Sequence, residues 1–318
     1  MLKGHKILLT GLTGNLGGSI ADALVDDNEL WGLARFSREG QREFWQQRGV
    51  HTVVGDCAEG EFTGVPMDFD YVIHCAAANP PDTFEEGMRG NAQVTGRLMA
   101  HCHRARAFMH LSTVGVYSEH ADPSHEYREE DVTGSSIMGH YEGTKLAAEG
   151  AVWALSTCFG IPAIICRLGV QYGCFDRGGL LGLILRAVLQ GETVYLPKYR
   201  TNVIRPISDD DVIGFLPALL GAATVPPTTV NLAGDEDIAT REVVDIFAEL
   251  AGVTPHIELT EAVDYPTIRV NGDRRRAIAG DCRVPLRDGI RRMYHNLAPK
   301  LRQAPGDDNI FKPLRASR

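Results

Sequence analysis

The sequence lacks both a long apolar run and an excess of positive charge. Its 318 residues include 32 lysines and arginines against 41 aspartates and glutamates, which gives a formal net charge of -9. A membrane-spanning helix needs about 20 mostly apolar residues, and a polyanion-binding surface needs a basic patch. We therefore expect a soluble protein that binds neither a membrane nor a nucleic acid.

The cysteines form no recognisable framework. They are odd in number, contain no Cys-x-x-Cys pair and are scattered along the chain: Cys57, Cys75, Cys102, Cys158, Cys166, Cys174 and Cys282. This pattern predicts neither disulfides nor a zinc ribbon, and it fits a reducing cytoplasm. The start of the chain leads into a strand rather than a signal peptide. The acidic residues 209–211 are expected at a helix start, so we predict no metal site.

Short apolar segments alternate with amphipathic ones through the first half of the chain, which predicts an α/β fold. The predicted strands are 6–10, 30–34, 51–54, 70–74, 107–111 and 163–166. The predicted helices are 15–25, 38–48, 84–103 and 138–159. Such alternation implies a doubly wound parallel sheet that binds ligands at the carboxyl ends of its strands.

The alternation loosens after Arg167. We expect a dinucleotide-binding core over 1–167, and over 168–318 a smaller substrate lobe interleaved with returns to the core sheet. The elements predicted there are helices 178–190, 210–220 and 240–251 and a strand at 229–232. The basic tail after Pro299 is expected to be solvated and partly mobile.

A glycine-rich turn follows the first predicted strand and opens the first helix. It runs from Gly11 to Gly17, and its expected cofactor-binding residues are Gly11, Thr13, Gly14, Asn15, Leu16 and Gly17. In this context the turn predicts a Rossmann dinucleotide site, because the glycines admit the pyrophosphate and the helix start supplies free N–H groups. An ordinary glycine-rich loop is the alternative.

The end of the second strand predicts which dinucleotide binds. NAD sites usually carry an acidic residue there, whereas this chain has Arg35, Ser37 and Arg38. These donors fit a 2′-phosphate and favour NADP(H), with NAD possible. After the third strand, Asp56 and its neighbour Cys57 are expected beside the adenine, although an acidic turn residue is the simpler reading of Asp56.

Tyr141 and Lys145 lie one helical turn apart. A phenol has an unperturbed pKa near ~10, and a nearby ammonium favours its ionised form. The spacing places both side chains on one helix face, from which Lys145 can approach either the phenol or a cofactor ribose. Taken alone, the pair is a weak signal, because most pairs with this spacing are surface residues.

Several motifs occur together in the order of one family. The chain resembles an extended short-chain dehydrogenase/reductase of the NAD-dependent epimerase/dehydratase family over at least Lys6 to Asp211. The matching segments are Thr-Gly-x-x-Gly-x-x-Gly at 10–17, His-x-Ala-Ala at 74–77, the helix segment 91–95 and the Ser-Thr-x-x-Val-Tyr segment at 112–117.

This resemblance implies roles for particular residues. Thr113 would hydrogen-bond the substrate oxygen, Tyr141 would transfer the proton, and Lys145 would bind the nicotinamide ribose while lowering the pKa of the phenol. Ser112 is the alternative hydroxyl if the register is shifted by one residue. The resemblance implies that Cys75, Ala76 and Ala77 lie beside the nicotinamide ribose and that Asn91 also binds the cofactor. A homodimer through helices 84–103 and 138–159 is also implied.

Departures from the family pattern narrow the reaction. Val114 and Gly115 stand where sugar dehydratases carry an acidic pair. Gly169 stands where many nucleotide-sugar enzymes carry Asn, and the arginine expected before segment 207–211 is shifted to Arg205. Both departures weaken the case for a nucleotide diphosphate substrate. We therefore expect an NADP(H)-dependent oxidoreductase acting on a secondary alcohol or ketone of a sugar-like or small polyfunctional substrate. The alternatives are a nucleotide-sugar epimerase that retains its NAD(P) and a non-catalytic dinucleotide sensor.

Overall fold

The core of the protein is a seven-stranded parallel sheet. The computed structural model describes residues 1–78, 81–134, 139–175, 178–261 and 268–303. The strand order is β12-β7-β5-β4-β1-β2-β3, and all six pairings are parallel. The strands are β1 (Lys6–Thr10), β2 (Glu29–Ala34), β3 (His51–Val54), β4 (Tyr71–His74), β5 (Ala107–Thr113), β7 (Ala163–Leu168) and β12 (Thr228–Leu232). The predicted α/β fold with a doubly wound parallel sheet is confirmed.

Helices cover both faces of this sheet. Apolar side chains of α1 and α7 pack on one face, and those of α4 and α5 pack on the other. The elements of this part are α1 (Asn15–Leu24), α2 (Gln41–Gln47), η1 (Cys57–Glu59), α3 (Phe84–Gly87), η2 (Met88–Gln93), α4 (Val94–His101), η3 (Val114–Val116), α5 (Tyr141–Phe159), α7 (Asp209–Gly221) and α9 (Asp273–Ala279). No helix in the described part of the chain is long and apolar enough to cross a membrane.

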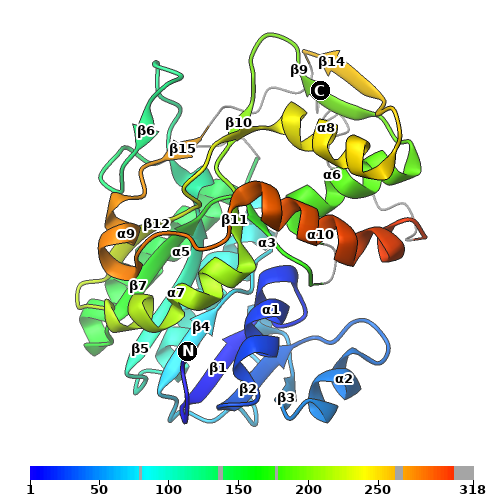
Figure 1. Cartoon of the computed structure of the whole chain (residues 1–318). Helices are drawn as coiled ribbons and strands as arrows, with labels where there is room; N and C mark the ends of the chain where they lie inside the picture. The colour runs from blue at the N-terminus through cyan, green and yellow to red at the C-terminus, as the bar shows by residue number, and fades with distance from the viewer. Residues whose placement is uncertain (79–80, 135–138, 176–177, 262–267, 304–318) are drawn as a thin grey trace.

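Part of the remaining chain forms a smaller lobe with its own apolar core. Figure 1 shows α6, α8 and α10 gathered beside β9 and β14, apart from the main sheet. The elements outside the main sheet and its helices are β6 (Glu126–Tyr127), β8 (Gln171–Tyr172), α6 (Gly179–Gln190), β9 (Val194–Pro197), β10 (Val203–Ile204), β11 (Ile207–Ser208), β13 (Ile238–Ala239), α8 (Thr240–Ala251), β14 (Ile257–Thr260), β15 (Arg269–Val270) and α10 (Leu286–Leu301).

The structure corrects two predicted elements. The helix expected over 84–103 is divided by a π-helical segment, η2. Two glycines here lie against other segments: a Cβ on Gly87, the last residue of α3, would meet Thr144, and one on Gly90 of η2 would meet Ala78. A solvated tail was expected after Pro299. Instead, helix α10 continues to Leu301, and the side chain of Leu301 is buried. The rest of that predicted tail, 304–318, lies outside the described residues.

Candidate active site

The glycine turn joins β1 to α1 in a form that only glycine permits. Gly11 has φ of 77°, and a Cβ there would lie 2.8 Å from the backbone nitrogen of Ala76. A Cβ on Gly17 would overlap the carbonyl oxygen of Gly11. Gly14 precedes the first residue of α1, so the free N–H groups of the helix start face this turn. The turn and helix start therefore fit a dinucleotide pyrophosphate.

The segment after β4 is held beside this turn. Thr10 on β1 pairs in register with His74 on β4. The Thr10 hydroxyl lies 2.7 Å from His74 Nδ1 and accepts from the Ala76 N–H at 3.3 Å. The structure thus brings predicted cofactor residues 75–77 next to the glycine turn.

Asn91 is buried in η2 and uses its side-chain amide within the protein. Its Oδ1 accepts from the Ala78 N–H at 2.9 Å, and its Nδ2 donates to the Ala78 carbonyl at 3.2 Å and to Thr144 Oγ at 3.0 Å. Asn91 therefore ties the loop after β4 to helix α5, the helix of Tyr141.

Tyr141 and Lys145 lie in the first turns of helix α5, and Lys145 reaches β5. Lys145 is only 2% exposed, and its Nζ donates to the Leu111 carbonyl at 2.6 Å and lies 3.5 Å from His110 Nε2. Burial lowers the pKa of Lys145 to about 8. The pKa of Tyr141 is raised to about 12 by burial and by the neighbouring Glu142. The phenol is thus held in its acid form rather than ionised, a difference from the expected effect of the lysine.

Ser112 and Thr113 have different surroundings at the end of β5. Ser112 is buried, and its hydroxyl donates to Glu149 Oε1 at 2.5 Å. Thr113 is partly exposed, and within the described residues its hydroxyl accepts only from the Gly115 N–H at 3.1 Å. Thr113 is therefore the hydroxyl that remains accessible to a ligand.

A buried ion pair lies beneath these hydroxyls, and the sequence reading missed it. Arg167 on β7 binds Glu149 on α5 at 2.8 Å, with both side chains under 10% exposed. Arg167 also lies over the ring of Tyr117, whose hydroxyl donates to Asn231 at 2.6 Å. Glu149 lies one helical turn after Lys145, and this spacing was the only feature of the sequence that could have pointed to the ion pair.

The residues predicted at the adenine end occupy the ends of β2 and β3. Arg35, Ser37 and Arg38 are exposed there, and Arg35 has no ion pair with a carboxylate in the described parts of the chain. Asp56 caps η1 by accepting from the Ala58 N–H at 2.9 Å, which agrees with the simpler reading. Burial raises the pKa of the neighbouring Cys57 to about 12.

The comparison with known protein families shows which family this chain belongs to. Residues 7–233 match the NAD dependent epimerase/dehydratase family. This chain belongs to that family. It is an enzyme of the short-chain dehydrogenase/reductase type, as its motifs predicted. No curated protein sequence matches it.

Solved structures of sugar-nucleotide enzymes share the fold of this epimerase/dehydratase family member. UDP-glucuronic acid 4-epimerase from Bacillus cereus, in complex with UDP-glucuronic acid and NAD, is 19% identical with a TM-score of 0.79, covering 92% of this chain and 99% of its own. UDP-N-acetylglucosamine 4-epimerase from Methanobrevibacter ruminantium is 16% identical with a TM-score of 0.81, covering 94% and 100%. MoeE5, in complex with UDP-glucose and NAD, is 21% identical with a TM-score of 0.80, covering 93% and 99%.

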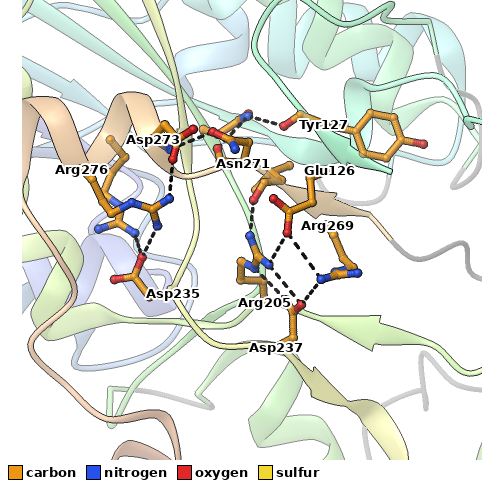
Figure 2. A network of polar contacts seen from close by, with 12 residues as sticks. Glu126, Tyr127, Arg205, Asp235, Asp237, Arg269, Asn271, Asp273 and Arg276 are labelled. Carbon is orange, nitrogen blue, oxygen red and sulfur yellow. Dashed lines mark hydrogen bonds and ion pairs between the residues drawn. The ribbon is translucent and has the colours of Figure 1, made fainter. Parts of the chain in front are cut away.

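In this family member the displaced arginine is already paired. Arg205 binds Asp237 through two nitrogens, Glu126 at 2.9 Å and the Val270 carbonyl at 2.7 Å (Figure 2). Arg269 shares both carboxylates, Asp237 at 2.7 Å and Glu126 at 3.5 Å. The network joins β6, β15 and the segment before β13. The two carboxylates neutralise the charge of Arg205. Its guanidinium therefore links these segments to one another instead of forming a free anion-binding site.

Proposed function

We propose that this chain transfers a hydride between a nicotinamide dinucleotide and a secondary alcohol or ketone carbon of a sugar-like substrate. The observation that supports the proposal is the buried Lys145, which donates to the Leu111 carbonyl two residues before Thr113 and interacts electrostatically with Cys75, after β4. The dinucleotide supplies or accepts the hydride when bound. Thr113 orients the substrate oxygen, Tyr141 carries its proton, and the Lys145 ammonium binds and orients a ribose.

Tyr141→Phe tests this proposal directly. It removes the proton carrier but keeps the ring, so we expect turnover to fall by about 10²–10⁴-fold while the dissociation constant of the dinucleotide stays within a few-fold. Steady-state kinetics and fluorescence titration measure the two quantities. Substantial residual turnover would contradict the role of Tyr141.

We further propose an epimerase that keeps its cofactor within each cycle. Two of the structural neighbours are named as 4-epimerases, and this likeness supports epimerisation over net reduction. Protein purified without added cofactor should then carry tightly bound oxidised dinucleotide. Empty protein that consumes reduced cofactor stoichiometrically would reject the epimerase and favour a reductase.

A second candidate is an NADP(H)-dependent reductase, and Arg35 is the observation that favours it. Its exposed guanidinium at the end of β2 is available for a 2′-phosphate. We expect NADPH to bind about 10–100-fold more tightly than NADH, a preference that Arg35→Ala should largely remove. Dissociation constants for both cofactors decide this. A wild-type preference for NADH would defeat the NADP(H) assignment.

The proposed substrate class is sugar-like molecules in general rather than nucleotide diphosphates alone, because Arg205 is neutralised by Asp237 and Glu126. A screen of ketones, lactols and nucleotide sugars, with the Tyr141→Phe protein as control, would identify the class.

We also propose a cytoplasmic homodimer paired through α4 and α5. Exposed Trp153 and Phe159 on α5 support this arrangement.

A further inference from the structure

His110 is a buried histidine without an evident structural reason. It lies on β5 with no exposed surface, on the strand face that turns Phe108 and Ser112 toward α5. The nearby His74 is fully bonded, because its ring nitrogens contact Thr10 and Thr95. In contrast, His110 Nδ1 has no hydrogen-bond partner in the described parts of the chain. An apolar side chain at this position would avoid the unpaired nitrogen.

The other nitrogen of His110 meets the lysine of the candidate active site. Lys145 Nζ lies 3.5 Å from His110 Nε2 and 2.6 Å from the Leu111 carbonyl. An ammonium has three N–H donors and cannot accept, so Nε2 must accept and the imidazole proton must sit on Nδ1. Burial and the charge of Lys145 hold the pKa of His110 well below its usual range, which keeps the ring neutral.

We infer that His110 is a positioning residue: its neutral imidazole accepts a hydrogen bond at Nε2 from the Lys145 ammonium and so fixes the place of that ammonium. Together with the Leu111 carbonyl it occupies two of the three N–H donors and leaves the third for a dinucleotide. The inference rests on the proposed role of Lys145. Other titratable groups near the pair are Glu149 on α5 and His74 and Cys75 at β4, and the charge of Glu149 favours the ammonium.

Two substitutions separate the acceptor from the ring volume. His110→Phe keeps a ring but removes the acceptor, whereas His110→Gln keeps an acceptor oxygen at similar reach. We expect His110→Phe to weaken dinucleotide binding by about 3–10-fold. We also expect it to move the alkaline loss of activity to lower pH, because a less stabilised ammonium loses its proton earlier. His110→Gln should retain the wild-type affinity and pH limb, and His256→Phe, an exposed site in the other lobe, is the matched control.

Imidazole nitrogen NMR tests the inference without any activity. In the wild-type protein His110 should carry its proton on Nδ1 and leave Nε2 unprotonated, and Lys145→Met should shift the Nε2 signal. A proton on Nε2, or an Nε2 signal that ignores Lys145→Met, would overturn the inference even if the enzyme is active. The inference would also be overturned if folded His110→Phe bound the dinucleotide with wild-type affinity and lost activity at the same alkaline pH as the wild type. If no substrate turns over, the NMR result and the dinucleotide affinities still decide.

Discussion

Adjacent hydroxyls at the end of β5 show how tertiary contacts assign a role at the scale of one residue. Ser112 is committed to Glu149, which Arg167 also binds. Thr113 makes only a local backbone contact within the described residues. The sequence left both residues as candidates because they differ only by one register step. The buried ion pair, which sequence spacing could not identify, separates them.

Thr113→Val should therefore lower turnover with little change in stability, whereas Ser112→Ala should lower stability with little change in turnover. Without its hydroxyl, Thr113→Val should lose about 10²–10³-fold in turnover at nearly unchanged stability. Ser112→Ala should keep turnover within a few-fold. It should lower the free energy of unfolding by about 1–3 kcal/mol, because Glu149 loses a buried donor. Kinetics and thermal unfolding of both variants test this, and the reverse pattern would return the catalytic role to Ser112.

At the scale of elements, helix α1 is fitted closely to the segment after β8. Phe175 packs on Gly18 of α1 and stacks on Trp45 of α2 at 5.8 Å between ring centroids. The fingerprint predicted glycines at 11, 14 and 17 for the cofactor, but it gave no reason for the next one. Gly18 is explained only by a ring from 157 residues further along the chain.

Gly18→Ala should destabilise the protein by about 1–3 kcal/mol, because its methyl group overlaps the Phe175 ring. Gly214→Ala, a matched change on the exposed side of α7 with open space around it, should instead stabilise by about 0.5–1 kcal/mol. Chemical denaturation measures both. If adding Phe175→Leu to Gly18→Ala restores no stability, the proposed contact is not the cause.

At the scale of the whole molecule, Asp209 links helix α1, on the main sheet, to strand β8, whose Tyr172 belongs to the core of the smaller lobe. This buried first residue of α7 accepts from Ser19 on α1 and from Gln171 on β8. Burial raises its pKa from 3.8 to about 7, although both hydrogen bonds act to lower it. The acidic run 209–211 was expected only as a helix start. The structure has the helix start there, but its N-cap is Ser208, so all three acidic residues lie in the first turn.

The raised pKa of Asp209 predicts a pH-dependent stability. The native state keeps the proton on Asp209 up to about pH 7, whereas the unfolded state releases it near 3.8. This contribution is thus fully present below pH 3.8 and is lost as the pH rises through about 7. The melting temperature of wild type minus that of Asp209→Asn should fall over this range. A pH-independent difference, or the same slope for the exposed control Asp26→Asn, would contradict the assignment.

The sequence by itself determined the order of the core elements, the glycine turn and the spacing of Tyr141 and Lys145. These features depend on local periodicity and backbone conformation, which neighbouring residues set. Only the tertiary structure decided that Lys145 rests on His110, that Ser112 is bound to Glu149, and that Arg205 is neutralised by Asp237. The partners lie 32 to 37 residues apart in sequence. Such pairings arise only when packed segments meet.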